Sequence, residues 1–331
     1  MISLSGKDSF VIYQDSISKN NNLSIGKWEL VNSKSVVSNA SFVFNIFNNK
    51  SYILNNSPNI IEDEINVSQP KKFNEKNISV KEYQKGINKV IKLCQNKILE
   101  KCIISRIVKV NFESDNYYKM FQKLCEEYKD GFKYLLNHPK FGMWIGISPE
   151  TLIDGSKKKG FYTQALAGSK LKIDYSTWSS KEIEEHRYVV DFIRDKIKRN
   201  GNITHQSKVY EKIAGDVKHL NKDFKFSLKK SYLSFLDILH PTPAIAGIPL
   251  NKSLETINDI ESHQRSLYCG YIGIIDQNSC ELYVNLRCGR ISLNEIELFV
   301  GGGITNKSNA ESEYKETEIK SQTLLSIIKK M

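Results

Sequence analysis

The chain has 331 residues, 40% hydrophobic and 26% charged, which is enough to bury a sizeable core and is ordinary for a soluble globular protein. No apolar run approaches the ~20 residues of a membrane span, and the N-terminus lacks the basic stretch and apolar core of a secretory signal. The net charge of +11 comes from basic residues spread along the chain, which argues against nucleic-acid binding and suits attraction of a small dianion.

Apolar periodicity predicts strands and amphipathic helices along the whole chain. In the first half we expect strands 10–13 and 41–47, a connection 57–77, a helix 79–99, a strand 101–110, a helix 117–128, and paired strands 132–136 and 143–147. From residue 148 we expect a turn 148–150, strands 151–153 and 161–169, a helix 179–198, and strand-like pieces 208–213 and 217–220. After these we expect a helix 228–239, a rigid loop 240–249 and a helix 253–260. The last predicted strands are 267–276 and 280–288, joined by a hairpin, and 296–300.

This order of elements predicts a layered α+β fold, because antiparallel strands mix with long helices without βαβ alternation or an internal repeat. Six scattered cysteines include no C-x-x-C pair, which predicts free thiols in a reducing cytoplasm.

Three consecutive glycines, Gly301, Gly302 and Gly303, follow the last predicted strand and precede a helix that begins near Asn309, a good N-cap. Glycines expose backbone N–H groups with no side chain in the way. We therefore expect a turn that forms an anion site together with the helix N-terminus.

On that last helix, Glu313, Glu316 and Lys320 are spaced i, i+3 and i+7, which places them on one face. Two carboxylates and an ammonium that face the glycines suit a hard cation together with an anionic ligand. The alternative is a solvated charged helix after a tight turn, which is the usual meaning of a charge run.

Lys101 shares one side of its predicted strand with Ile103 and Ile107, because side chains alternate along a strand. A lysine among isoleucines is partly desolvated, which favours a lowered pKa. The alternative is a lysine at a strand end whose ammonium reaches water.

Further polar residues stand in apolar surroundings. Glu185 lies beside the apolar stripe of its helix, and a buried acid needs a partner, for which a cation is one candidate. Arg287 ends a very apolar strand, where a substrate carboxylate would serve as its partner. Gly168 and Ser169 end a strand at which a ligand approaches the backbone, and His219 lies between aliphatic residues, as core histidines usually do. The residues alone predict a cation-dependent enzyme that acts on a small acidic molecule.

Seven motifs, in this order, resemble those of the chorismate-utilising enzymes: Ser148-Pro149-Glu150, Ala165-Leu166-Ala167-Gly168-Ser169, Glu184-Glu185-His186 with Val189-Val190-Asp191, His240-Pro241-Thr242-Pro243-Ala244, the Arg287 strand, Gly301-Gly302-Gly303, and Glu313 and Glu316 with Lys320. The resemblance covers roughly residues 79–331. It implies an α/β/β/α sandwich of large, mostly antiparallel sheets, with a divergent strand-rich part at 1–75 and the chorismate-binding catalytic region at 76–331.

Within that family, Lys101 matches the lysine base of enzymes that add water at C2 of chorismate, and anthranilate synthases usually lack it. Ala167 stands where aminodeoxychorismate synthases usually carry a nucleophilic lysine. The loop 240–244 looks like that of isochorismate synthases, and Gly302 is often alanine in the family. The resemblance thus implies an isochorismate synthase; the alternative is a salicylate synthase, which also eliminates pyruvate.

The resemblance also implies roles for individual residues. Lys101 would be the general base and Glu150 the general acid, with His219 orienting the C4 side of the substrate. Mg²⁺ would be held by Glu185, Glu313 and Glu316. The substrate would be bound by Gly168, Ser169, Ala244, Arg287, Gly301, Gly302, Gly303 and Lys320.

The implied substrate is chorismate, with no nucleic acid, membrane or fused glutaminase involved, and a monomer is the family's usual form. Prevalence in the family favours menaquinone over catechol siderophore biosynthesis. Alternatives from other classes are a non-catalytic relative, a large subunit that needs an amidotransferase partner, and a nucleic-acid module driven by charge.

Overall fold

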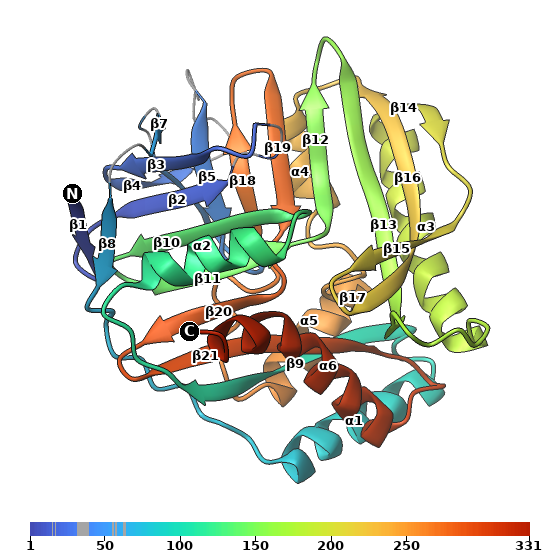
Figure 1. Ribbon diagram of the computed structural model, residues 1–331. Coiled ribbons are helices and arrows are strands. Elements are labelled where there is room, and N and C mark those ends of the chain that lie inside the picture. The colour runs from blue at the N-terminus through green and yellow to red at the C-terminus, as the bar shows by residue number, and fades with distance from the viewer. Residues whose placement is uncertain (15, 17, 32–39, 55, 57, 62–63) are drawn as a thin grey trace.

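Two large antiparallel sheets lie face to face in the computed structural model, with helices on their outer sides (Figure 1). The structure describes residues 1–331 except 15, 17, 32–39, 55, 57 and 62–63. The expected α+β class and its layered α/β/β/α sandwich are confirmed.

The first sheet has nine strands and includes the strand that carries Lys101. In spatial order they are β17 (Gly247–Ile248), β9 (Lys101–Asn111), β21 (Glu295–Ile304), β20 (Cys288–Ser292), β11 (Gly142–Ser148), β10 (Phe132–His138), β2 (Phe10–Gln14), β3 (Asn21–Ile25) and β7 (Asn59–Ile60). β9 and β21 pair along ten residues, so the end of this sheet is a rigid platform.

The second sheet has ten strands. In spatial order the first nine are β14 (Gly201–Gln206), β16 (Val217–Leu228), β13 (Gly160–Leu171), β12 (Thr151–Ser156), β19 (Ser279–Val284), β18 (Tyr271–Ile275), β5 (Ser41–Asn45), β6 (Ser51–Leu54) and β4 (Trp28–Val31), while β15 (Tyr210–Ala214) pairs with β16. A small parallel pair joins β1 (Ile2–Ser5) to β8 (Ile65–Ser68). The N-terminal strands thus extend both large sheets.

Helices cover the outer faces of both sheets: α1 (Val80–Gln95), α2 (Tyr117–Glu127), α3 (Ser180–Asn200), α4 (Tyr232–Leu239), α5 (Leu250–Ile260) and α6 (Ala310–Ile328). α2 and α6 share one apolar cluster with the nine-stranded sheet, and α3 and α4 pack on the ten-stranded sheet. Among the described residues, no helix is long and apolar enough to cross a membrane.

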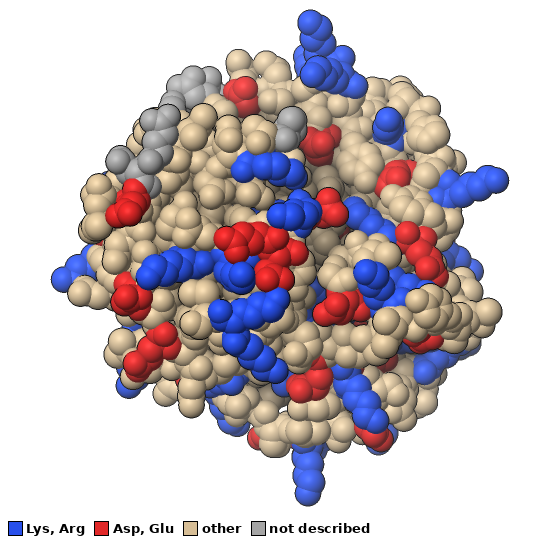
Figure 2. Space-filling model, in the orientation of Figure 1, with Lys and Arg blue, Asp and Glu red and all other residues tan. Residues whose placement is uncertain are grey.

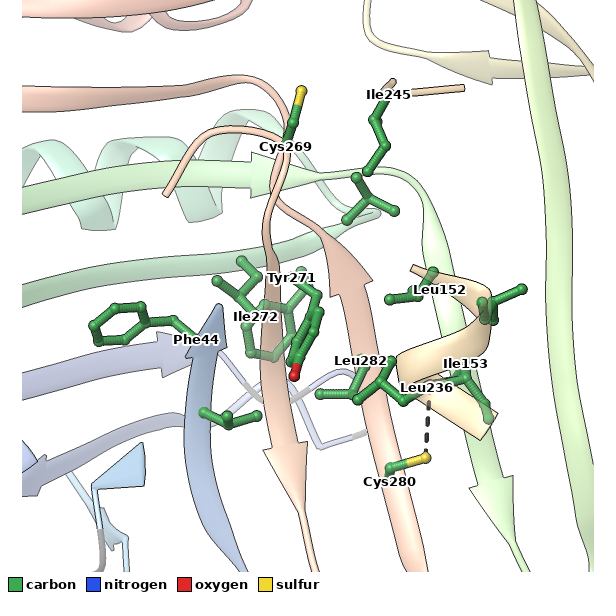
Figure 3. Close-up of a cluster of buried hydrophobic side chains, with 14 of the residues drawn as sticks. Phe44, Leu152, Ile153, Leu236, Ile245, Cys269, Tyr271, Ile272, Cys280 and Leu282 are labelled. Atoms are coloured by element: carbon green, nitrogen blue, oxygen red, sulfur yellow. Dashed lines mark hydrogen bonds between the residues drawn. The ribbon is translucent and has the colours of Figure 1, made fainter. Parts of the chain in front are cut away.

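The alternation of side chains along the strands explains the layers. On β10, Tyr134 and Leu136 enter the cluster between the sheets, while Leu135 points to the helices outside. Figure 3 shows part of the inner cluster, with Ile245 and Cys269 at one edge. Both of these residues also line the cavity described below, so the packed core continues into its wall.

Some predicted elements have different bounds. The predicted turn 301–303 lies inside β21, because these glycines pair with β9 at Ile103, Ile104 and Ser105. The predicted strand 280–288 is two strands, β19 and β20, which belong to different sheets, and 267–276 is extended only over β18.

Three further differences concern shorter stretches. The predicted connection 57–77 contains β7 and β8, although 57 and 62–63 lie outside the described residues. The predicted helix 228–239 begins only at Tyr232, because β16 runs on to Leu228. The expected hairpin between β18 and β19 is confirmed.

Two capping boxes offer a matched test of what starts these helices. Ser79 caps α1 with Glu82, and Ser179 caps α3 with Glu182 in the same way. We expect Ser79→Ala and Ser179→Ala each to lower the free energy of unfolding by about 1 kcal/mol, because each leaves helix N–H groups without their acceptor. Urea unfolding measures this, and a loss below about 0.3 kcal/mol in both variants would contradict it.

Candidate active site

A cavity lies where the ends of the two sheets meet α3 and α6. β13 and β16 supply one wall, β21 supplies another, and the chain segments between the sheets close it. Its polar or backbone-exposing lining residues are Glu150, Gly168, Ser169, Glu185, His219, Arg287, Gly301, Gly302, Gly303 and Lys320, and its apolar ones include Ala244, Ile245, Leu286 and Phe299. Eleven of the fourteen residues singled out in the sequence therefore line one cavity, although they come from distant segments.

The three glycines make room for charged side chains. A Cβ atom on Gly303 would overlap the carboxylate of Glu185 and would lie 2.8 Å from Cε of Lys101. A Cβ atom on Gly302 would lie 3.3 Å from Oε2 of Glu313. The glycines thus serve neither a turn nor a left-handed backbone; they let buried acids approach the strand.

The N–H groups at the helix N-terminus that was expected to bind an anion already have a hydrogen-bond acceptor in the protein. Asn309 is the N-cap of α6, as predicted, and its side chain accepts hydrogen bonds from the N–H groups of Glu311 and Ser312. The predicted anion site of glycine turn and helix end is therefore wrong in this form. α6 instead contributes the side chains on the face that it turns to β21.

Lys101 is fully buried, which confirms the prediction from strand alternation. Its Nζ lies 3.0 Å from Oε1 of Glu185, a residue of α3. Burial alone would raise the pKa of Glu185, but Lys101 and Lys181 outweigh it and hold that pKa below its ordinary value. The ion pair is not aligned as a hydrogen bond, so the described residues leave hydrogen-bonding capacity on this amine.

The acids of α6 face the same region. Glu313 Oε1 lies 2.9 Å from Nζ of Lys181, and its Oε2 is buried without a hydrogen-bond partner among the described residues. Glu316 pairs with Lys320 at 2.7 Å, and Lys320 also donates to the carbonyl of Gly301. Neither acid is part of a merely solvated helix face.

These two acids have opposite pKa shifts. Burial raises the pKa of Glu313 to about 7, and the nearby charge of Glu316 adds to this shift. Burial would also raise the pKa of Glu316, but Lys320 and Lys181 outweigh it and hold the pKa at about 2. Two like charges close together separate in this way, because ionising the second acid costs more than the first.

The donor set is suited to Mg²⁺. Glu185, Glu313 and Glu316 approach one stretch of β21 from two helices, and hard carboxylate oxygens are the ligands that Mg²⁺ prefers. The orphaned Oε2 of Glu313 is the atom that best fits a cation. The described residues contain no group of three acidic, His or Cys side chains already close enough to hold an ion, because lysines separate the carboxylates.

Glu150 is buried in the segment between β11 and β12. Burial raises its pKa to about 7, although Lys101 and Lys212 act in the opposite direction. A carboxyl group with this pKa holds a proton near neutral pH and can donate it.

His219 is neutral and has a defined orientation. Its Nδ1 lies 2.9 Å from the carbonyl of Gly168 and 3.1 Å from Oγ of Ser169. Burial, followed by the charges of Arg287 and Lys320, lowers its pKa to about 3. If Nδ1–H donates to that carbonyl, the buried Nε2, which has no partner among the described residues, is an acceptor.

The backbone beside His219 is irregular. Gly168 has φ +70°, and the pairing of β13 with β16 shifts register between Ala167 and Ser169. Such a bulge redirects the strand and exposes backbone to the cavity.

Arg287 lies between β19 and β20 with a φ of +43°, a left-handed conformation that is uncommon for arginine. Burial lowers the pKa of Arg287. Within the described part of the chain it has no ion-pair partner, unlike Arg106, Arg265 and Arg290. A buried guanidinium without a carboxylate is suited to bind one from a ligand.

Glu150 and Arg287 lie on two segments that cross from one sheet to the other. Hydrogen bonds join the segments: Val284 N–H donates to the Glu150 carbonyl at 3.0 Å, and Ile147 N–H donates to the Arg287 carbonyl at 3.2 Å. The two residues are therefore held relative to each other by backbone contacts.

Lys181 and Tyr268 were not singled out from the sequence. Lys181 lies four residues before Glu185 on α3, so helical spacing was a usable signal. Tyr268 is buried, lines the cavity, and brings its hydroxyl within 3.0 Å of where a Gly301 Cβ would be. Nothing in its local sequence indicates this position.

The two glycine positions predict unequal effects of the same change. Gly303→Ala should lower the free energy of unfolding by about 1–3 kcal/mol, because the new methyl group overlaps a buried ion pair that is held on both sides. Gly302→Ala should cost less than about 1 kcal/mol, because its neighbour needs to move only slightly. Equal losses in urea unfolding would contradict the role given to Gly303.

Glu150 predicts a pH-dependent effect on stability. Its folded pKa of about 7 exceeds its ordinary 4.5, so the folded protein binds this proton more tightly than the unfolded chain does. The stability that this proton contributes is complete below pH 4.5 and is lost as the pH rises through 7, a loss of about 3 kcal/mol. From pH 5 to pH 8, Glu150→Gln should therefore gain up to about 3 kcal/mol relative to the unchanged protein. Urea unfolding at both pH values tests this, and a pH-independent difference would contradict it.

Comparisons with known proteins agree with this geometry. A vibriobactin-specific isochorismate synthase of Vibrio cholerae is 24% identical over 265 residues, which are 75% of this chain and 66% of that protein. An anthranilate synthase component 1 of Lactococcus lactis is 26% identical over 275 residues, which are 76% of this chain and 58% of that protein. The matched part thus spans two thirds or less of each relative's length.

The structure of MenF, the menaquinone-specific isochorismate synthase of Escherichia coli, matches with a TM-score of 0.80 at 18% identity, over 97% of this chain and 88% of that one. This likeness establishes the fold. The family described as "Chorismate binding enzyme" matches residues 17–329. The resemblance seen in the motifs is therefore confirmed, and the chain belongs to the family of chorismate-binding enzymes.

Proposed function

We propose that this protein is an isochorismate synthase, which adds water at C2 of chorismate and releases the C4 hydroxyl. One observation carries the proposal: the cavity holds Glu150, whose pKa is raised to about 7, in a site where the charge of the buried Lys101 acts on it. A buried acid and a buried amine that act on one site suit a reaction that takes one proton and gives another. The Vibrio relative carries the proposed activity in its name.

In the proposed mechanism, Lys101 acts as the general base toward a water molecule that attacks C2. Glu150 gives its proton to the C4 hydroxyl, which leaves as water, and the ring double bonds shift between the two carbons. One water enters and one leaves, so the reaction is a reversible isomerisation. The retained Lys101 also distinguishes the site from anthranilate synthases, which usually lack that lysine.

Binding of the substrate would use charged and polar groups that line the cavity. Arg287 has no carboxylate partner among the described residues and would pair with the enolpyruvyl carboxylate. The backbone at Gly168 and Ser169 and the glycines of β21 would surround the ring, with Ala244 against its face. His219 would accept a hydrogen bond from a substrate hydroxyl through Nε2.

Mg²⁺ is part of the proposal. Glu185, Glu313 and Glu316 would hold it, and the bound ion would offset the carboxylate charges and bind the ring carboxylate of the substrate. Figure 2 shows basic and acidic side chains intermingled over one face of the molecule. The net charge of +11 would still favour the approach of a dianion to this site.

The product would serve one of two pathways. The Vibrio relative is named for vibriobactin, and the E. coli structure for menaquinone. Menaquinone biosynthesis is the proposed destination, on its prevalence in the family. The cavity itself is formed by residues that act on chorismate in either case.

Product analysis tests the proposal. Purified protein with chorismate and Mg²⁺ should yield isochorismate by HPLC, and Lys101→Ala should lower the rate at least 100-fold, because a positioned base contributes about 10²–10⁴. Lys109→Ala is the control, because Lys109 lies on the same strand but pairs with Glu295 far from the cavity. Salicylate with pyruvate would show a salicylate synthase, and unchanged chorismate in the absence and presence of ammonia would refute the assignment.

A further inference from the structure

Lys181 lies between two of the acids that are proposed to bind Mg²⁺. Its Nζ is 2.9 Å from Oε1 of Glu313 and 3.8 Å from Oε2 of Glu185. These acids come from different helices, α6 and α3, whose N-terminal ends also meet through Lys307 and Glu184. Figure 1 shows these two helix ends at the same side of the molecule. One ammonium thus joins the two helices at the carboxylates.

The charges of this cluster balance without any bound ion. Glu185, Glu313 and Glu316 face three lysines, which are Lys101, Lys181 and Lys320. Lys101 and Lys320 are already engaged, the former with Glu185 and the latter with the carbonyl of Gly301 and with Glu316. Lys181 is the lysine of the three that bridges acids on separate helices.

A second cavity beside Lys181 could accept its ammonium group. The Lys181 side chain is 14% exposed and lines this cavity of about 440 Å³, which shares Ser169 and Lys320 with the lining of the first. A lysine has a flexible stem, so its ammonium can turn into this cavity, whose lining includes Asp174 and Glu182, while Cα stays in place. Departure of the ammonium would release Oε1 of Glu313 and Oε2 of Glu185 to bind another cation, while Oε1 of Glu185 stays paired with Lys101.

We propose that Lys181 is an internal counter-ion that occupies the acidic cluster in the metal-free enzyme and is displaced when Mg²⁺ binds. This inference rests on the proposed function, because it takes the three acids as the Mg²⁺ site. Lys181 acts through these acids and is a positioning residue. It prevents mutual repulsion of the carboxylates without metal and in exchange weakens metal binding.

Metal binding to the full-length protein tests this proposal directly. Isothermal titration with Mg²⁺, and separately with Mn²⁺, measures the affinity of the cluster for each ion. Lys181→Met should bind Mg²⁺ about tenfold more tightly than the unchanged protein, because no ammonium has to leave. Lys181→Arg should keep the affinity near its original value, because it retains a cation at the acids.

A matched control is Lys315→Met. Lys315 lines the same second cavity but pairs with Glu311 on the exposed side of α6, so its loss should leave the affinity unchanged. Thermal unfolding gives a second reading that also checks folding. Lys181→Met should be less stable in EDTA and should gain more from added Mg²⁺ than the unchanged protein.

The outcomes separate two kinds of failure. If the unchanged protein binds Mg²⁺ and Glu316→Gln weakens it, but Lys181→Met binds no more tightly, then the counter-ion role is wrong and the metal site stands. If the unchanged protein binds no Mg²⁺, or Glu316→Gln leaves binding unaltered, then the metal part of the proposed function fails and the counter-ion role fails with it.

Discussion

The buried ion pair between Lys101 and Glu185 is the interaction on which the rest of the site depends. It brings the first residue of β9 and the first half of α3 together over Gly303. Burying two charges costs several kcal/mol each, and their attraction repays this only when both are held in place. The capping box of α3 and the ten-residue pairing of β9 with β21 hold them. The strand can approach this pair only because Gly303 has no side chain.

The same constraint explains why the region is built from opposite charges in equal number. Burial raises the pKa of a carboxyl group in this region, and for Glu150 it outweighs the opposing charges of Lys101 and Lys212. Glu185 and Glu316 stay ionised because lysines lie beside them, and Glu313 is intermediate. The region thus holds one carboxyl group with a raised pKa and two carboxylates whose pKa values lysines hold low.

Local patterns in the sequence predicted the parts of this arrangement that depend on a single element. Strand alternation predicted that Lys101 is buried, and helical spacing placed Glu313 and Glu316 on one face. The prediction that the glycine run is a turn was wrong. The glycines leave room for Glu185 of α3, which lies more than a hundred residues earlier in the chain. The gathering of the site residues was expected from the resemblance in the motifs.

Contacts between different helices and strands could not be predicted from local sequence patterns. The bridge from Lys181 to Glu313 joins two helices that are more than a hundred residues apart in the chain, and no local pattern links them. The apolar run that ends at Arg287 looks like one strand, because a residue sequence does not show that the chain changes sheets there. Tyr268 lines the cavity, and this position also depends on contacts between elements that the local sequence does not show.

The crossing segments at Glu150 and Arg287 have a mechanical consequence. Both residues lie where the chain passes between the two sheets. The large side chains of the inner core set the spacing of the sheets. This spacing therefore also sets the distance of Glu150 and Arg287 from β9 and β21. The packing of the core between the sheets thus fixes the dimensions of the cavity. A change in core volume should therefore shift Glu150 and Arg287 together, so that apolar residues far from the cavity influence its dimensions without touching it.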